Sequence, residues 1–370
     1  MFKATDARRV IVTLGLVLSV SHWVPLVAAQ GSPQGRYAVR LVKPTSWYYY
    51  MDKMLYTHNG DSRQFGPQHD LARDNVALLF TQYGLKVSLH PFLWSGNTYY
   101  NVIGERTGTV RPTQIYIVGG HYDSVNCPGA DDNASAVATL LEIARLLGAW
   151  DSEATIRLIS FDREEQGLIG SRAYVNDYGT DDVRGMISLD MISYAGPDPD
   201  KARIRGRPSS DPLKALVAQA VRDYAGLAPT VEGALDRSDH APFEWRGYQA
   251  LWLAEYNYIE RNPHYHKITD SLDTPGYISA EYGANITRAV LGWLVDAAGV
   301  QPDRPLGDLN CDWVVNNFDI DPFTLALTDP AGYKQRYPDC DILLGDINGD
   351  GQVNNFDIDP FVVCLLGGNC

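Results

Sequence analysis

Histidine and carboxylate side chains recur at five places in the central part of this sequence, and together they could bind divalent metal ions. His121 and Asp123 follow the apolar run 114–118, and Asp131 and Asp132 lie in the loop after them. The other places are Glu164 with Glu165, Asp190, Asp239 with His240, and His264 with His266 and Asp270. Imidazole and carboxylate ligands suit zinc. Two such ions would need one shared ligand, and Asp132 is well placed to bridge them.

The elements that must position these residues alternate between strands and helices. The run 114–118 has the β-branched character of a strand and ends at Gly119 and Gly120, so the chain turns there. We expect further strands at 85–92, 101–104, 155–161, 185–192 and 250–254, and helices at 68–83, 134–149, 168–178, 211–225 and 279–299. This alternation predicts an α/β fold with a mostly parallel, mixed sheet flanked by helices. Ligands bind such sheets where the strands end, so the five places could meet at one edge.

Five ordered motifs within residues 60–300 resemble those of the M28 family of zinc aminopeptidases, which includes secreted bacterial leucine-type enzymes. They are GHYDS at 120–124, GADDNAS at 129–135, EEQGLIGS at 164–171, Asp190 in its strand, and SDH at 238–240 with Tyr265-His266. Ala136 departs from the pattern, because the family often has glycine there. The resemblance implies a phosphorylase/hydrolase-like zinc exopeptidase fold over residues 30–300.

The same resemblance implies a ligand set for two Zn²⁺ ions. Asp132 would bridge them, His121 and Asp190 would complete one site, and Glu165 and His266 would complete the other. Glu164 would be the general base, and the Asp132–Asn133 peptide bond would be cis. The substrate would be a peptide with a free N-terminus.

Physical chemistry supports these roles. Two zinc ions polarise a carbonyl and lower the pKa of a shared water towards neutrality. Glu164 can take the proton of that water and return it to the leaving amine. Asp123 can orient the His121 imidazole, and Asp270 has a suitable spacing from His266. Tyr265 either donates a hydrogen bond to the tetrahedral oxyanion or packs, and the sequence leaves both open.

Two other functions remain open at this point. A glutaminyl cyclase resembles this family but uses one zinc and releases ammonia, and a non-catalytic binding protein can be built on a peptidase fold, as in the transferrin receptor. The complete ligand set and the sequence Glu-Glu-Gln-Gly at 164–167 favour hydrolysis. Other hydrolase signatures, H-E-x-x-H and G-x-S-x-G, are missing. Aromatic candidates for the pocket walls (Trp94, Phe243, Tyr256 and Tyr258) favour an apolar substrate side chain.

The N-terminus is typical of a secretory signal peptide. Lys3, Arg8 and Arg9 precede a short apolar run at 10–20, and small residues at 27–29 suit cleavage after Ala29. We therefore expect a secreted protein with no membrane span after the signal is removed, and one associated with the cell surface if its C-terminal segment binds there. The formal net charge of −14 argues against nucleic-acid binding.

A repeat with an offset of 38 residues follows the linker at 301–306 and indicates a second domain at 307–370. Each copy reads as an EF-hand-type Ca²⁺ loop within a small helical domain. The predicted side-chain ligands are Asp308, Asn310, Asp312, Asn316 and Asp319, and then Asp346, Asn348, Asp350, Asn354 and Asp357. The pair resembles a dockerin-type domain, which implies a cohesin-like or cell-surface partner. The second loop has Gly351 at the position of the sharp turn, and the first loop has Trp313 there instead. The second loop is therefore the better match to a calcium site.

Four of the five cysteines lie in this acidic segment, which carries 11 aspartates and no glutamate against one lysine and one arginine. In an exported protein such a cluster predicts disulfides. We expect the pairs Cys311–Cys340 and Cys364–Cys370, and Cys127 as a loop thiol.

Overall fold

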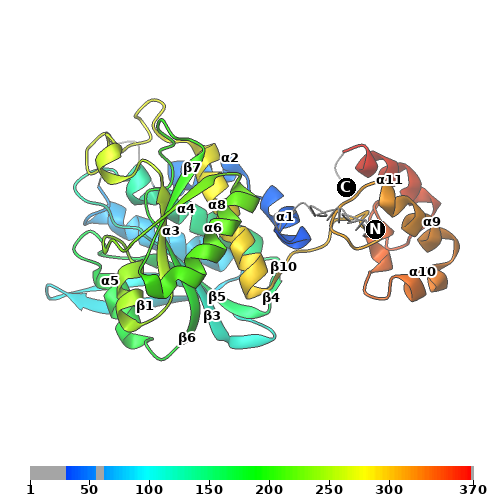
Figure 1. Cartoon of the computed structure of the whole chain (residues 1–370), viewed down its shortest axis with the longest axis horizontal. Coiled ribbons are helices and arrows are strands. Elements are labelled where there is room, and N and C mark those ends of the chain that lie inside the picture. The colour runs from blue at the N-terminus through cyan, green and yellow to red at the C-terminus, as the bar shows by residue number, and fades with distance from the viewer. Residues whose placement is uncertain (1–30, 56–61, 368–370) are drawn as a thin grey trace, which may run out of the picture. The chain divides into compact units, whose positions relative to one another are not determined.

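A mixed sheet of eight strands forms the centre of the computed structural model, which describes residues 31–55 and 62–367 (Figure 1). The strand order is β1-β2-β5-β3-β6-β9-β7-β8. The strands are β1 (Lys86–Trp94), β2 (Asn97–Arg106), β3 (Arg111–His121), β5 (Ala154–Phe161), β6 (Asp182–Leu189), β7 (Lys201–Arg205), β8 (Ala228–Glu232) and β9 (Ala250–Glu255). The predicted α/β class and mixed sheet are thereby confirmed.

The four central strands β5, β3, β6 and β9 are parallel, and this determines where the loops meet. His121 at the end of β3 pairs with Phe161 at the end of β5, and Gly119 pairs with Ser188 near the end of β6. The chain therefore leaves these strands at the same edge of the sheet, which is where an open α/β sheet places its ligands. The outer pairs β1/β2, β2/β5 and β7/β9 are antiparallel.

Helices cover both faces of the sheet because side chains alternate along each strand. Val118 faces a core shared with one group of helices, whereas its neighbour Ile117 faces a separate core built with Tyr174 and Phe243. The first group is α1 (Pro33–Arg40), α2 (Pro44–Tyr49), α3 (Pro67–Gln82), α4 (Ser135–Leu147), α6 (Asp211–Ala225) and α8 (Ala280–Ala298). The second is α5 (Ile169–Asp177) and α7 (His240–Arg246).

Sequence patterns located the long elements and missed the short ones. Each strand and helix expected between residues 68 and 299 is present, with shifts at its ends. Strands β7 and β8 have five residues each and were not predicted. Asp131 and Asp132 were expected in a loop, but they lie in a short helical turn, Ala130–Ala134, that leads into α4. The two-residue strand β10 (Val300–Gln301) pairs with β4 (Asp151–Ser152) at the start of the predicted linker.

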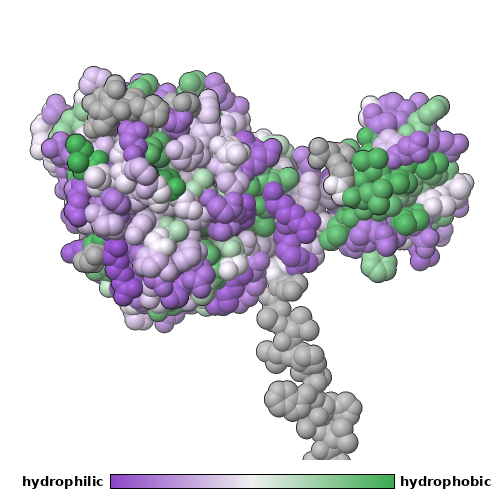
Figure 2. All heavy atoms as spheres, turned by 90° about the horizontal axis from the view of Figure 1, so that it is seen from above, coloured by the Kyte–Doolittle hydropathy of each residue, from purple (hydrophilic) through white to green (hydrophobic). Residues whose placement is uncertain are grey.

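The C-terminal segment repeats one structural unit. Short 3₁₀ turns, Asn317–Asp319 and Asn355–Asp357, lead into α9 (Ile320–Thr328) and α11 (Ile358–Leu365), and α10 (Pro330–Arg336) lies between the two units. Phe323 and Phe361, which are equivalent in the repeat, stack in its core with ring centroids 4.1 Å apart. Other hydrophobic side chains of this segment gather on its surface (Figure 2).

The disulfide Cys311–Cys340 is present, as predicted. Cys370 of the second predicted pair lies outside the described residues, as does the predicted signal peptide at 1–29. Cys127 is a free thiol, and it is buried. Within residues 31–55 and 62–367, no helix combines the length and the apolar character that a membrane crossing requires.

Candidate metal centre

The predicted ligands come from loops that leave the sheet at its shared edge. His121 is the last residue of β3, Asp190 directly follows β6, and Glu165 lies in the turn after β5. Asp132 lies in the turn before α4, and His266 lies in the long loop after β9. All of these side chains are buried except that of His266, which is 36% exposed. One side of the centre is therefore open to the surface.

Asp132 lies between the two imidazoles. Its Oδ1 is 3.2 Å from Nε2 of His121, and its Oδ2 is 3.2 Å from Nε2 of His266. Asp190 Oδ1 lies 3.7 Å from the same His121 nitrogen, and Glu165 Oε2 lies 3.3 Å from the same His266 nitrogen. Asp132 thus lies within 3.2 Å of both imidazoles. Among the described residues, two groups have ligand atoms that all lie within 4.8 Å of one another: His121 with Asp132 and Glu165, and His121 with Glu164 and Asp190.

These spacings fit zinc. Bonds of about 2.0–2.2 Å in a tetrahedral site place neighbouring ligand atoms about 3.3 Å apart. Among the described residues, Nε2 of His121 has no well-oriented hydrogen bond although three carboxylates lie within 4.0 Å of it. Oε1 of Glu165 is buried and also lacks a partner there. Buried lone pairs left in this way are suited to metal coordination.

Asp123 supports both sides of the centre. Its backbone carbonyl accepts a hydrogen bond from Nδ1 of His121 at 3.1 Å. A carbonyl only accepts, so Nδ1 carries a proton, and Nε2 is the nitrogen that the ring would offer to a metal ion. Its carboxylate accepts hydrogen bonds from the backbone N–H groups of Glu164 and Glu165, at 3.2 and 3.3 Å. One residue therefore fixes a histidine and the paired glutamates relative to each other.

Asp270 and Asn133 fix the turn that carries Asp132. The Asp270 carboxylate accepts from the backbone N–H groups of Asp131 and Asp132, at 2.7 and 3.2 Å. Asn133 donates to the carbonyl of Leu189 at 2.9 Å, which ties this turn to the end of β6. The Asp132–Asn133 peptide bond is cis, as the resemblance implied.

Burial and mutual repulsion of the carboxylates dominate the electrostatics. Burial raises the pKa of Glu165 to about 7, and the carboxylate of Asp132 adds to this rise. Burial and the neighbouring carboxylates Asp190 and Glu165 hold the pKa of Glu164 well above its usual value. Burial lowers the pKa of His266, but hydrogen bonding to Asp132 and Glu165 outweighs it and brings that pKa to about 10. A divalent cation would relieve this excess of negative charge.

The family model for peptidase family M28 matches residues 101–292 of the chain. The chain belongs to peptidase family M28. It is 28% identical over 214 residues to a probable leucine aminopeptidase of Trichophyton verrucosum (strain HKI 0517), which covers 53% of this chain and 56% of that protein. The chain thus spans only about half the length of this relative.

The fold of this M28 chain is similar to that of two solved structures. An aminopeptidase from Aneurinibacillus sp. strain AM-1 matches with a TM-score of 0.61 at 19% identity, over 73% of this chain and 97% of that one. The glutaminyl cyclase of Macrostomum lignano matches with a TM-score of 0.61 at 19% identity, over 73% and 94%. At these identities the likeness concerns the fold, so the reaction must be argued from the site.

The mostly polar pocket at the M28 centre also has apolar lining residues that sequence reasoning did not select. Met191, Trp252 and Ile259 line it together with Tyr265, Arg237 and the metal-site carboxylates. Tyr265 stacks on His266 with ring centroids 3.8 Å apart. Trp252 donates from Nε1 to the carbonyl of Asp190 at 3.0 Å. Met191 directly follows Asp190 in the chain, a signal that could have identified it.

Of the aromatic residues predicted as pocket walls, Tyr258 packs on Trp252 with ring centroids 4.7 Å apart, whereas Trp94 contacts Tyr99 and Tyr256 lies over Arg203. Phe243 is fully buried against Phe161 and Tyr174, so its prediction as a pocket wall was wrong. Asp239 and His240 are also fully buried, and neither lines the pocket. Burial raises the pKa of Asp239 to about 7 and lowers that of His240 to about 3. His264 is not among the residues that line the pocket, and it hydrogen bonds to Thr269 at 2.9 Å.

Proposed function

We propose that this protein is a secreted aminopeptidase that binds two zinc ions and hydrolyses the first peptide bond of peptides. The observation that carries the proposal is the carboxylate of Asp132 between Nε2 of His121 and Nε2 of His266, in a chain of family M28. Relatives named leucine aminopeptidases support the reaction class.

The residues present divide into two sites. His121, Asp132 and Asp190 would hold one zinc ion, and Asp132, Glu165 and His266 would hold the other. When bound, zinc supplies Lewis acidity towards the substrate carbonyl and the attacking water. Glu164 lines the pocket beside the ligands, with its Oε2 4.0 Å from Nε2 of His121. It is placed to take a proton from that water and to deliver it to the leaving amine. Tyr265, also on the pocket wall, is proposed to donate to the oxyanion.

Two observations favour hydrolysis over the alternatives. Both histidines and all three ligating carboxylates face one another, which a one-zinc cyclase would not need. A non-catalytic binding protein would have no reason to keep Glu164 buried among carboxylates that raise its pKa. The fold by itself does not discriminate, because a glutaminyl cyclase shares it.

A panel of aminoacyl anilides with free and with blocked amino groups tests this function. We expect zinc-dependent cleavage of the free-amine substrates only, and the fastest cleavage for apolar side chains because Met191, Trp252 and Ile259 line the pocket. Chelation should abolish activity, and added zinc should restore it. Cleavage of blocked substrates would contradict the aminopeptidase assignment. Zinc binding without any cleavage would favour the cyclase or the non-catalytic protein. Cyclisation of peptides with an N-terminal glutamine would then indicate the cyclase, and no reaction would indicate the non-catalytic protein.

We also propose that the C-terminal segment, 307–370, is a dockerin-like calcium-binding domain. Its two loops have matching hydrogen bonds. The carboxylate of Asp308 accepts from the N–H groups of Asp312 and Trp313, and that of Asp346 accepts from those of Asp350 and Gly351. The first carboxylate of each loop thus bonds to the backbone of its own loop, which supports the proposal that both repeats adopt the same EF-hand-type turn.

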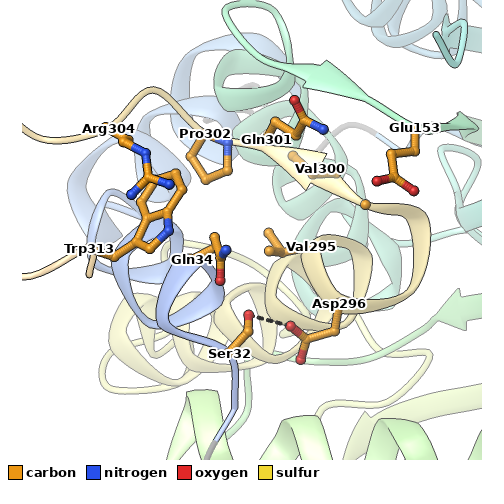
Figure 3. Close-up of a pocket in the computed structure, with 11 residues that line it drawn as sticks. Ser32, Gln34, Glu153, Val295, Asp296, Val300, Gln301, Pro302, Arg304 and Trp313 are labelled. Carbon is orange, nitrogen blue, oxygen red and sulfur yellow. Dashed lines mark hydrogen bonds between the residues drawn. The ribbon is translucent and has the colours of Figure 1, made fainter. Parts of the chain in front are cut away.

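The first loop takes this conformation despite its departure from glycine. Trp313 has a φ of 71°, close to the 83° of Gly351, and Cys311 has a φ of 59° where the second repeat has Gly349 at 75°. The Arg304 guanidinium stacks on the Trp313 indole at 4.3 Å (Figure 3). Residues other than glycine are strained at positive φ, so the stacking and the Cys311–Cys340 disulfide help to hold the loop in this shape.

Calcium removal is expected to destabilise this segment. Carboxylates of Asp308, Asp319, Asp346 and Asp357 repel one another within their loops unless a cation is bound. Calorimetry should show a transition whose Tm falls on chelation and is restored by calcium but not by magnesium at equal concentration. The matched substitutions Asp308→Ala and Asp346→Ala should each remove one site from a calcium titration. An identical Tm with and without calcium would contradict the proposal.

The same proposal includes a secreted location for the protein and a protein partner for its C-terminal segment. Phe318 and Phe356 occupy equivalent positions in the two repeats and are 76% and 78% exposed. Exposed aromatic side chains of this kind are suited to contact another protein, such as a cohesin-like or cell-surface partner. The Cys311–Cys340 disulfide is consistent with an oxidising compartment and hence with secretion.

A further inference from the structure

A fully buried arginine outside the ligand set contacts the loop that carries two of the ligands. Arg63 precedes α3 and is 1% exposed. Its Nε donates to the carbonyl of Tyr122 at 2.8 Å, Nη1 to that of Pro128 at 2.6 Å, and Nη2 to that of Gly129 at 2.8 Å. One guanidinium thus satisfies three carbonyls of a single loop.

This loop joins the histidine of one metal site to the shared carboxylate. It begins after His121, and its last contact with Arg63 lies three residues before Asp132. The backbone N–H of Arg63 also donates to Oγ of Ser124 at 2.9 Å, and Ser62 donates to the carbonyl of Val125 at 2.7 Å. The segment 62–63 therefore contacts the loop along most of its length.

The packing around the guanidinium is tight. Gly129 has a φ of 66°, and a Cβ there would lie 2.4 Å from the carbonyl oxygen of Asp132 and 3.2 Å from Nη2 of Arg63. Burial lowers the pKa of the Arg63 guanidinium, and the carboxylates of Asp270, Asp123 and Asp132 oppose this by attracting its positive charge. The loop is thus shaped around a buried cation that also offsets part of the negative charge of the centre.

We propose that Arg63 is a positioning residue that fixes His121 relative to Asp132 and thereby sets the zinc affinity of the centre. This inference rests on the proposed function, in that the ligated ion is taken to be zinc. Arg63 lies outside residues 101–292, so the family model does not account for it. Lysine could not replace it, because a single ammonium cannot reach three carbonyls from the directions that the planar guanidinium serves.

The test compares Arg63→Lys and Arg63→Met with Arg157→Met in the full chain. Arg157 is a half-buried arginine of β5, and its hydrogen-bond and ion-pair partners among the described residues are Glu105, Tyr174 and Asp181, none of which is a predicted metal ligand. Zinc affinity is measured by competition with a chromophoric chelator, and Tm is measured with and without zinc. We expect both Arg63 variants to bind zinc at least tenfold more weakly and to gain less Tm from zinc. Arg157→Met should lower Tm and leave zinc affinity unchanged.

Wild-type zinc affinity in the Arg63 variants, with a Tm loss like that of Arg157→Met, would overturn the inference and leave Arg63 a structural residue. Should neither Arg63 variant fold, Ser124→Ala removes the acceptor of the Arg63 backbone N–H and so loosens the contact of Arg63 with the loop, and it must then weaken zinc binding at least twofold or the inference fails. Zinc competition does not depend on turnover, so an inactive wild type that binds zinc would refute the proposed function and leave this test intact. A wild type that binds no zinc would refute both.

Discussion

Glu164→Gln is expected to lower kcat about a thousandfold while both zinc ions stay bound. A positioned general base accelerates a reaction about 10²- to 10⁴-fold, and glutamine keeps the shape of the side chain while losing its basicity. Glu164 lies at the pocket beside the ligands, with its Oε2 4.0 Å from Nε2 of His121. Anilide turnover and metal analysis of the purified variant check both halves of the prediction.

The neighbouring glutamate provides a matched control. Glu165→Gln changes the same atoms one residue later, where Oε2 lies 3.3 Å from Nε2 of His266. We expect this variant to lose zinc along with activity, which separates a ligand from a base. Activity of Glu164→Gln within tenfold of the wild type would show that another group accepts the proton.

Asp132→Ala is expected to weaken zinc binding at both sites by more than about a hundredfold, because even residues that only support metal ligands contribute ten- to a hundredfold. Among the ion pairs of the described residues, only the Asp132 carboxylate lies within 3.2 Å of both imidazoles. Its loss therefore removes a proposed ligand from each zinc ion. The rise of Tm on adding zinc should disappear, and activity should fall to the background rate.

Asp131→Asn is the control for this substitution. The carboxylate of Asp131 accepts from Ser193 at 2.6 Å and from Asn262 at 3.0 Å, and it takes no part in the ligand pairs described above. Its replacement should lower the stability of the fold and leave the zinc content near two per chain. Retention of both zinc ions by Asp132→Ala would mean that the centre is not bridged as proposed.

The local sequence pattern was sufficient to predict the long helices and strands, but it was not sufficient to predict the short ones. The apolar runs of β3, β5 and β6 and the periodicity of α3 and α6 identify those elements, because their side chains repeat with the period of the element. Strands β7 and β8 are too short to establish a period and are stabilised by pairing with neighbours distant in sequence.

The candidate metal ligands and the family could be predicted from sequence, because the residues concerned stand in short motifs of fixed spacing. The residues that support these ligands were found only in the folded molecule. Arg63 reaches the metal loop from 59 to 66 positions away in sequence, and Trp252 and Ile259 reach the pocket from β9 and the loop after it. These contacts arise from strand order and helix packing, which join segments that share no local pattern.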